Sequence, residues 1–588
     1  MANLTKLASQ QLREIILNSL GQLVANGKAP AEPLPDFRVE IPADKSNGDF
    51  AVNTAMVCAK AFKMAPRQIA ELICSEVSLA GTYFERFEIA GPGFINFFLS
   101  RRWFSDIMDT VITEGENYGK TDTGNGKKML VEFVSANPTG PMHIGNARGG
   151  AIGDCLAEIL NWAGYDVQRE FYVNDAGNQI EKFGKSLNLR FTQLCSEKGQ
   201  VIIAESEKNV AKICETIYNN SEDFPMPDDV YLGMDIIEHA FNYIQENGTD
   251  IINDTEENRK KALTDFALPK NVAGLERDLL KYRITYDNWF RESTLHNNGA
   301  VNEIIEKLRA SGYTYEQEGA LWFKSSELGD EKDRVLIRAN GVVTYFVPDI
   351  AYHYNKLVTR GYDKAIDIFG ADHHGYIPRM KAALQALGVN PSKLDIVIMQ
   401  MVNLVRNGEK YKLSKRSGKA VTLSTLLDEI PIDAARFFFN LREPDSHFDF
   451  DLDLAVEKSS QNPVYYVQYA HARICSLISN LSAEGCVADD YKVEELDILD
   501  KPQEIELIRQ LAALPNEIDS AAKAYDPAKI TKYSVELATL FHKFYDACSV
   551  KNAETAELKK ARLVLCKAVL QALRNSLTIM KITCPEKM

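Results

Sequence analysis

One segment, residues 129 to 173, limits the possible folds of this chain more than any other. Its first part, Met129 to Val134, is an apolar, β-branched run with the length of a buried strand. Apolar residues then recur at helical spacing from Ile152 to Ala163, Gly164 ends this helix, and Tyr165 to Val173 returns to an extended pattern. Strand, helix and strand in this order form a βαβ unit, which requires a parallel sheet covered by helices. The sequence therefore predicts an α/β fold.

The same pattern recurs further along the chain, after a polar interruption. Arg334 to Val347, Ala365 to Phe369 and Asp395 to Leu404 are also predicted to be strands, with helices between them. Residues from about 190 to 280 are instead polar, acidic and helical. We interpret residues 125 to 430 as a doubly wound parallel sheet that carries a helical insertion.

Two smaller units flank this predicted sheet. Residues 1 to 115 combine helical periodicity, at Leu7 to Leu23 and Ala55 to Val77, with an extended stretch at Phe87 to Leu99, which predicts a small α+β domain. A link rich in glycine and threonine follows it. Residues 432 to 588 are almost wholly helical in pattern, with long amphipathic runs, so we predict an all-α bundle there.

The composition narrows the classes of function. The chain has 588 residues and a net charge of −15, from 82 acidic and 67 basic residues, so it is not a generally cationic nucleic-acid binder. We expect no DNA partner, and any RNA contact must use local basic surface. Ten scattered cysteines without a CxxC pair indicate a reducing cytoplasm and no zinc or disulfide framework. No run of 18 uninterrupted apolar residues and no signal-peptide core occur, so we expect no membrane association.

One glycine-containing segment resembles a phosphate loop but has the wrong spacing. Residues 115 to 121 read GENYGKT, with three residues between the glycines where a P-loop has four. The ring of backbone N–H groups would not close around a phosphate, so we predict a surface turn.

The first informative motif is VEFVSANPTGPMHIGNARGGAIGD, residues 131 to 154. A buried strand runs into a loop rich in proline and glycine and then into a helix that begins with small residues, Gly145, Gly149, Gly150 and Gly153. A nucleotide could lie against this helix N-terminus, whose free N–H groups and positive dipole end favour phosphate. His143 and Asn146 add side-chain donors. The alternative is a helix packed tightly on the sheet with His143 as a bystander.

The second motif is EKYKLSKRSGKAVTL, residues 409 to 423. It places five cations within ten residues of an acidic protein, at Lys410, Lys412, Lys415, Arg416 and Lys419. Ser414, Ser417 and Gly418 favour a loop over a helix, and a cationic loop suits a clamp on a triphosphate that lets pyrophosphate leave. The alternative is a solvated run of charges.

Together the two motifs resemble the signatures of class I aminoacyl-tRNA synthetases, His-Ile-Gly-His and Lys-Met-Ser-Lys-Ser. The surrounding residues narrow this resemblance to the arginyl-tRNA synthetase family, over nearly the whole chain. The blocks similar to this family are residues 131–145, REFYVNDAGNQ (169–179), TYFVPDIAYH (344–353), FGADHHGYIPRMKAA (369–383) and NPVYYVQYAHAR (462–473). The resemblance implies a Rossmann-like, HUP-type catalytic domain between an N-terminal add-on domain that binds tRNA and a helical anticodon-binding domain.

The resemblance also implies a reaction: ATP-dependent ligation of L-arginine to tRNA(Arg) through an arginyl-adenylate, with release of AMP and pyrophosphate. An ionised amino-acid carboxylate attacks the α-phosphate, so positioning and charge stabilisation suffice. His143, Lys412 and Lys415 are the expected catalytic residues, and Mg²⁺ accompanies ATP without a metal site of the protein. The expected ATP-binding residues are His143, Gly145, Asn146, His373, Lys412, Ser414 and Lys415. The family also implies that the adenylate forms only when tRNA is bound.

Selecting arginine requires acceptors for five guanidinium N–H donors. By motif position, Asp349 looks like the family's guanidinium carboxylate, and Tyr345 lies beside it. Glu132, Asn137 and His373 match the other positions that hold the amino acid. The alternative for Asp349 is a helix N-cap, and both roles can coexist. A zinc site at the His373–His374 pair lacks matching ligands.

The helical C-terminal domain contains aromatic and basic residues suited to stacking on unpaired anticodon bases. We expect Tyr469, Arg473 and Tyr545 to contact tRNA, with Tyr469 and Arg473 on one helical face. The alternative is an aromatic bundle core with a snorkelling arginine. We expect the protein to be a cytoplasmic monomer.

Other functions stay open at this point. A class I synthetase of another specificity is the nearest alternative, and the pairing of Tyr345 with Asp349 disfavours it. A small adenylyltransferase would not need the helical C-terminal domain. An RNA-binding relative with an inactive site would tend to lose His143, Lys412 and Lys415. Asn146, which replaces the second signature histidine, removes a group able to become cationic and puts its phosphate role in question.

Overall fold

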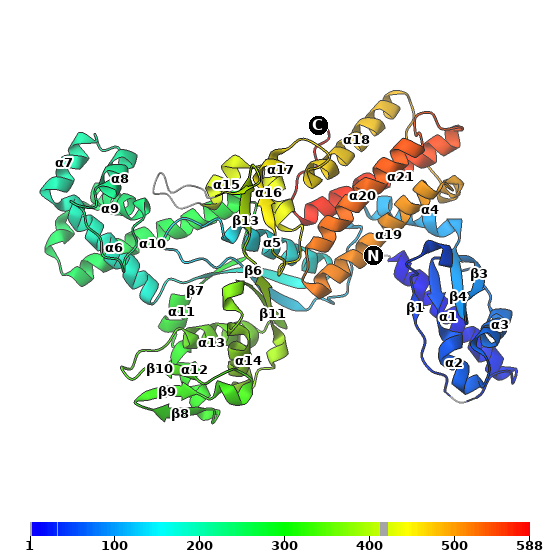
Figure 1. The fold of residues 1–588 in the computed structure, drawn as a ribbon, viewed down its shortest axis with the longest axis horizontal. Coiled ribbons are helices and arrows are strands. Elements are labelled where there is room, and N and C mark those ends of the chain that lie inside the picture. The colour runs from blue at the N-terminus through cyan, green and yellow to red at the C-terminus, as the bar shows by residue number, and fades with distance from the viewer. Residues whose placement is uncertain (1–2, 32, 412–421) are drawn as a thin grey trace.

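The computed structural model describes residues 3–31, 33–411 and 422–588, which are arranged around a central parallel sheet (Figure 1). Its five strands lie in the order β12-β11-β5-β6-β7, and each neighbouring pair is parallel. The strands are β5 (Lys128–Glu132), β6 (Asp166–Val173), β7 (Asn288–Arg291), β11 (Lys364–Gly370) and β12 (Leu394–Met399). Counted along the chain, the order is 3-2-1-4-5, which confirms the doubly wound sheet. The order reverses between β5 and β11, where ligands of such sheets bind.

Helix α5 (Asn146–Trp162) packs directly on this sheet. A Cβ atom added at Gly153 would lie 2.2 Å from Cγ of Phe133, and one at Gly150 would lie 2.8 Å from Cδ1 of Ile284. These two glycines therefore allow α5 to pack closely against its neighbours.

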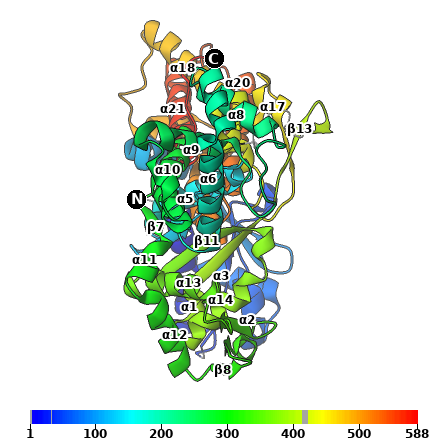
Figure 2. The ribbon, with the colours of Figure 1, turned by 90° about the vertical axis from the view of Figure 1, so that its left-hand side faces the viewer.

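The helical insertion is a separate unit with its own buried core. It begins earlier than predicted, directly after β6, and lies at one end of the molecule (Figures 1 and 2). Its helices are α6 (Asn178–Cys195), α7 (Glu197–Glu205), α8 (Val210–Asn219), α9 (Met234–Asn247) and α10 (Glu256–Lys281).

A second lobe follows β7 and differs from its prediction. The strand expected at Arg334 to Val347 ends at Ile337, because Phe346 already begins a helix that packs its apolar residues into a separate core. Strands β8, β9 and β10 form a small antiparallel sheet outside the central one. The elements of this lobe are α11 (Glu292–Asn297), α12 (Ala300–Ala310), β8 (Thr314–Gln317), β9 (Ala320–Phe323), β10 (Arg334–Ile337), α13 (Phe346–Tyr354) and α14 (Tyr376–Ala386).

The strand predicted at Asp395 to Leu404 divides into two. Strand β12 ends at Met399, and the chain then leaves the central sheet for a three-stranded one in the order β14-β13-β15. The elements here are β13 (Asn403–Arg406), β14 (Glu409–Lys410), α15 (Leu423–Glu429), α16 (Ile432–Phe439), β15 (Asp449–Asp451) and α17 (Leu452–Val456).

The N-terminal domain has the predicted α+β composition, with an antiparallel sheet in the order β1-β2-β4-β3. The helix predicted over Ala55 to Val77 is broken, because Pro66 begins a new helix. The elements are α1 (Leu4–Ala25), β1 (Val39–Glu40), β2 (Phe50–Val52), α2 (Thr54–Phe62), α3 (Pro66–Glu76), β3 (Phe84–Ala90), β4 (Phe94–Leu99) and α4 (Arg101–Glu114).

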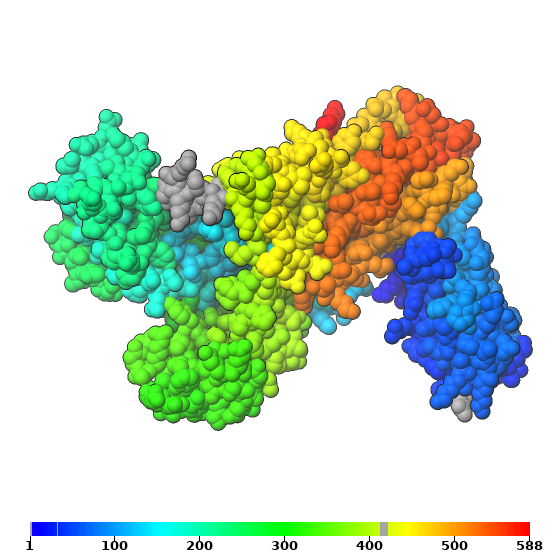
Figure 3. Space-filling model, viewed as in Figure 1, coloured from blue at the N-terminus to red at the C-terminus, as the bar shows by residue number. Residues whose placement is uncertain are grey.

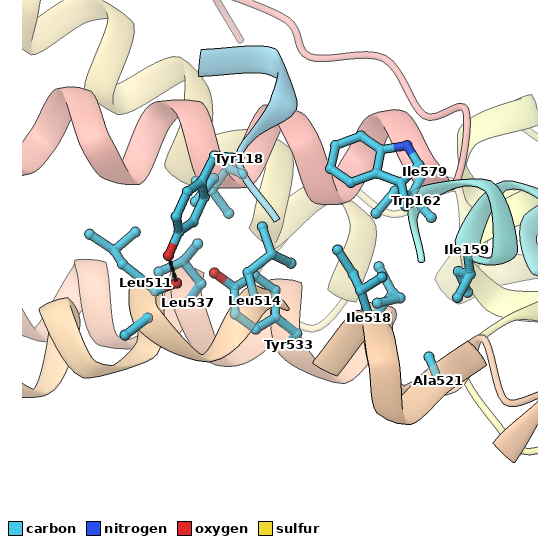
Figure 4. Packing of buried hydrophobic residues seen from close by; sticks show 14 of the residues in the cluster. Tyr118, Ile159, Trp162, Leu511, Leu514, Ile518, Ala521, Tyr533, Leu537 and Ile579 are labelled. Carbon is cyan, nitrogen blue, oxygen red and sulfur yellow. Dashed lines mark hydrogen bonds between the residues drawn. The ribbon is translucent and has the colours of Figure 1, made fainter. Parts of the chain in front are cut away.

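The C-terminal domain is the predicted helical bundle. Its long helices are α18 (Pro463–Ala483), α19 (Pro502–Ala524), α20 (Ala528–Ala547) and α21 (Ala556–Ile579). Helix α4 of the N-terminal part packs against α19 and α21. The segment at residues 115 to 121 is the predicted turn, with Glu116 and Asn117 exposed, but its middle is anchored in the bundle. Tyr118 is only 1% exposed, and its hydroxyl donates to the Leu511 carbonyl at 2.8 Å (Figure 4).

The N-terminal domain and the helical insertion lie at opposite ends of the long axis of the molecule, as separate lobes (Figure 3). The central sheet and the bundle lie between them. Among the residues that the structure describes, no helix is long and apolar enough to cross a membrane.

Candidate active site

The carboxyl edge of the central sheet begins with a strained turn after β5. Val134 and Ser135 have φ angles of 70° and 44°, in the left-handed region that a β-branched residue such as valine rarely adopts. The Ser135 hydroxyl donates to Glu132 Oε1 at 2.8 Å and accepts the Tyr172 backbone N–H at 3.1 Å. Strain of this kind concentrates at functional sites, where the surrounding structure holds it in place.

A buried group of charges lies beneath this turn. Lys356, in a π-helical turn (Asn355–Thr359) directly after α13, is 0% exposed, and its ammonium binds both Glu132 and Asp367. His353 places Nε2 at 2.7 Å from Asp367 and Nδ1 at 2.7 Å from the Asp349 carbonyl. Both ring nitrogens therefore lie within hydrogen-bonding distance of acceptors, and the Lys356 ammonium is shared by two carboxylates.

These charges set the pKa of the carboxylates in opposite directions. Burial raises the pKa of Glu132 in spite of Lys356. For Asp367, burial is outweighed by Lys356 and His353, which lower its pKa to about 2. Nearby, Glu170 is likewise buried and balanced by Arg360 at 2.6 Å, and it accepts the Tyr352 hydroxyl at 2.6 Å.

Two carboxylates at the same edge are not balanced in this way. Asp349 lies in the first turn of α13, and Glu292 follows β7 directly. Burial raises the pKa of Asp349 to about 7; His353 opposes this shift and the carboxylate of Glu292 adds to it. Burial also raises the pKa of Glu292, whose only ion-pair partner among the described residues is His296 at 3.4 Å. Among the described residues, no lysine or arginine forms an ion pair with either of these two carboxylates.

The other predicted arginine-site residues lie after neighbouring strands or at the start of α13. Tyr345 is the N-cap of α13 and 44% exposed, so Asp349 is not the N-cap itself. Asn137 is exposed after the strained turn. His373 is exposed directly after β11, with Nδ1 at 3.1 Å from Asp372. The structure thus brings the predicted residues to one edge of the sheet.

The first signature motif lies at the start of α5. His143 is exposed, and its Nδ1 accepts the Gly145 backbone N–H at 3.0 Å. Gly145 is the N-cap of α5 and Asn146 is its first residue. His143 also forms an antiparallel bridge with Thr422, so the end of the second motif meets the first. The predicted residues Lys412, Ser414 and Lys415 lie outside the described residues.

Comparison with known proteins decides the family. Three family models match: the arginyl tRNA synthetase N terminal domain over residues 10–99, the class I (R) tRNA synthetase catalytic domain over 107–477, and the DALR anticodon binding domain over 467–588. The chain is 48% identical over 588 residues to an arginine–tRNA ligase from Acetivibrio thermocellus, covering 100% of both chains. The chain belongs to the arginyl-tRNA synthetase family. The resemblance and the fold class predicted from the sequence are therefore confirmed.

Other relatives agree with this assignment. An arginine–tRNA ligase from Caldanaerobacter subterraneus is 47% identical over 588 residues, again covering 100% of both chains. The solved structure of Thermus thermophilus arginyl-tRNA synthetase has the same fold, with a TM-score of 0.69 at 20% identity, and the match covers 99% of this chain and 100% of that one.

In this arginyl-tRNA synthetase, the three residues predicted to contact tRNA form one cluster on the helical bundle. The Arg473 guanidinium lies 4.0 Å from the ring centroid of Tyr545 and 5.8 Å from that of Tyr469. Tyr469 is 39% exposed, and it lines with Arg473 a cavity of about 380 Å³. The cluster therefore lies at the surface of the bundle and not in its core.

The sequence analysis missed several residues of this synthetase site. Glu292 directly follows the end of β7, as Glu132 is the last residue of β5, and that position was its only signal. Asp367 interrupts the apolar run Ala365 to Phe369, and a charge inside a buried strand indicates a buried ion pair. Lys356 and His353 carry no such signal, because nothing in the sequence around them shows that they are buried beside Asp367 and, for Lys356, beside the remote Glu132.

Proposed function

We propose that this chain ligates L-arginine to tRNA(Arg) at the carboxyl edge of its sheet, through an arginyl-adenylate, with release of AMP and pyrophosphate. It belongs to a family of arginine–tRNA ligases, and its class I catalytic domain uses ATP. The observation that carries the proposal at the level of residues is the unbalanced pair Asp349 and Glu292, since a guanidinium needs anionic acceptors.

Arginine recognition follows from the charges of the site. Asp349 and Glu292 accept the guanidinium N–H groups. Tyr345 is the N-cap of α13, the helix that contains Asp349, and its ring can cover the guanidinium plane there. Glu132, Asn137 and His373, at the ends of neighbouring strands, hold the amino-acid end of the substrate. Glu132 is fixed for this role because Ser135 and Lys356 each occupy one of its oxygens.

ATP binds at the start of α5 in this proposal. His143 donates to the phosphates, and Gly145 and Asn146 present the helix N-terminus, whose dipole favours negative charge. Lys412, Ser414 and Lys415 neutralise the charge that develops on the leaving pyrophosphate. Mg²⁺ enters with ATP; in the described part of the chain, no group of three or more His, Cys, Asp or Glu is arranged to hold a metal.

The remaining parts bind tRNA. Tyr469, Arg473 and Tyr545 stack on anticodon bases. The N-terminal domain (1–115) contacts another part of the same tRNA, while residues 125–430 act as the catalytic unit and 432–588 as the anticodon-binding unit. The enzyme functions as a monomer in the cytoplasm.

A charging assay with each standard amino acid tests the specificity. Only arginine should be attached to tRNA, and attachment of another amino acid at a comparable rate would refute the proposal.

ATP–pyrophosphate exchange tests the coupling to tRNA: it should require arginine and should appear only when tRNA is added. Full exchange without RNA would contradict the coupling.

A further inference from the structure

Helix α10 of the insertion reaches from the insertion core to the two chain segments that flank the ATP site (Figure 1). One segment is Pro138 to His143, which leads into α5. The other is Thr422 to Asp428, which leads into and forms α15. The proposed mechanism assigns α10 no role, so the purpose of these contacts is open.

Two polar side chains of α10 bind the first segment. The Asn271 amide donates to the Pro138 carbonyl at 3.0 Å, and its oxygen lies 2.6 Å from Nε2 of His239 on α9, which fixes the amide orientation. One turn from the end of the helix, the Asp278 carboxylate accepts the backbone N–H of Met142. Both contacts reach backbone atoms, so they set the path of the chain directly before His143.

The last residue of α10 binds the second segment. The Lys281 ammonium donates to the Ser424 carbonyl at 3.1 Å, to the Ser424 hydroxyl at 3.2 Å and to Asp428 at 2.6 Å. Three donors of one ammonium thus meet three acceptors on α15, two at its start and one near its end.

The two segments also touch each other between these anchors. The Leu423 N–H donates to the Met142 carbonyl at 2.9 Å, and His143 bridges to Thr422. The three parts, α10 and the two segments, therefore form a closed triangle of contacts. A shift of the start of α15 relative to α10 must move Met142 and His143 as well.

We propose that Lys281 is a positioning residue for ATP: it fixes α15 against α10 and so sets how Thr422 and Leu423, the described end of the second motif, meet Met142 and His143 of the first. This inference rests on the proposed binding of ATP at His143. The Lys281 side chain is 34% exposed and that of Asp428 is 68% exposed, so the ion pair adds little to folding stability. Its effect on geometry is larger, because a displacement of about 1 Å can lower a rate about a hundredfold.

Lys281→Met tests the proposal, because methionine keeps much of the apolar stem and removes the ammonium. We expect the KM for ATP in tRNA-supported exchange to rise about tenfold or more, because a hydrogen bond from a charged group, here one that holds α15, is worth at least about that factor in an equilibrium constant. The KM for arginine should change by less than about two-fold. Lys281→Arg should restore much of the ATP affinity.

Lys261→Met is the matched control. Lys261 is on the same helix and pairs with Asp265 at 2.5 Å, but both side chains are solvent-exposed, and neither contacts the two segments. Lys261→Met should leave the KM for ATP and the KM for arginine unchanged. The melting temperatures of Lys281→Met and Lys261→Met should both match that of the wild type.

Two results would overturn the inference: a Lys281→Met enzyme no different from the control, or equal losses for ATP and arginine. Asn271→Ala, which removes the contact with Pro138, provides a second variant and should raise the same KM for ATP. If the wild-type enzyme itself showed no arginine-dependent exchange with tRNA, the proposed function would fail, and this outcome is distinct from either result.

Discussion

Asp349 should make arginine binding depend on pH near neutrality. Burial, opposed by His353 and reinforced by Glu292, raises its pKa to about 7. Only the ionised carboxylate pairs with a guanidinium, so affinity for arginine should fall as the pH decreases through this value, by about tenfold per unit below it. Titration calorimetry between pH 5.5 and 8.5 measures this, and a flat profile would remove Asp349 from the site.

Replacing Asp349 by asparagine should affect stability and binding in opposite directions. A pKa raised above its ordinary value of 3.8 means that the folded state binds the proton more tightly, so this residue costs stability as the pH rises from about 4 through 7. Asp349→Asn should therefore raise the melting temperature at pH 8, by roughly 2 °C or more, while weakening arginine binding. The exposed Asp490→Asn is the control, and a lower melting temperature for Asp349→Asn would contradict the argument.

Lys356 should matter for stability more than any exposed lysine. It is 0% exposed and binds two buried carboxylates, so Lys356→Met would leave Glu132 and Asp367 without their ammonium. We expect a loss of about 3–5 kcal/mol in the free energy of unfolding, measured by denaturant titration. Adding Asp367→Asn should recover part of the loss; no recovery would show that charge is not the cause.

At the level of elements, the close approach of α5 to the sheet depends on Gly153. A Cβ atom there would lie 2.2 Å from the ring of the buried Phe133. Gly153→Ala should lower the free energy of unfolding by about 1–3 kcal/mol, as overpacked cores do. Gly149→Ala on the same helix is the matched control: its Cβ would lie 3.5 Å from the flexible Met399 side chain, an ordinary contact. Thermal melts of both proteins compare the two, and equal melting temperatures would contradict the packing argument.

At the level of the whole molecule, one buried ion pair joins the catalytic sheet to the end of the chain. Arg436 on α16 and Asp154 on α5 are both 0% exposed and 2.6 Å apart, and Arg436 also donates to the Met580 carbonyl at 2.7 Å. Lys581 binds the same Asp154 at 2.7 Å. The position of the helical bundle on the sheet thus depends on charges from three distant segments.

Arg436→Met should loosen this junction. This change removes one cation from Asp154, and it leaves the Met580 and Tyr282 carbonyls without their donor. We therefore expect a loss of about 3–5 kcal/mol in the free energy of unfolding. Limited proteolysis should then cut between the catalytic and C-terminal units sooner than in the wild type. Arg442→Met, at an exposed position nearby, is the control, and the protease should cut this variant at the wild-type rate. Identical proteolysis of the two variants would contradict a role for Arg436 in holding the units together.

Most elements could be predicted because their signals are local. The unit from Met129 to Val173 and the helices of the C-terminal domain follow from apolar periodicity and from glycine and proline at their ends. The strand predicted at Arg334 to Val347 was wrong because the apolar residues after Ile337 serve helix packing in another core, and short apolar runs do not distinguish the two. The places of Lys412, Ser414 and Lys415 stay a prediction.

The sequence by itself determined the family and the sheet, because motifs and periodicity are read from neighbours along the chain. Only the tertiary structure decided which carboxylates pair with a lysine or arginine and which do not. Glu132 and Lys356 are 224 positions apart, yet their contact fixes the charge of the site. Ionisation depends on burial and on the charges within a few ångströms, and the fold alone brings those charges together.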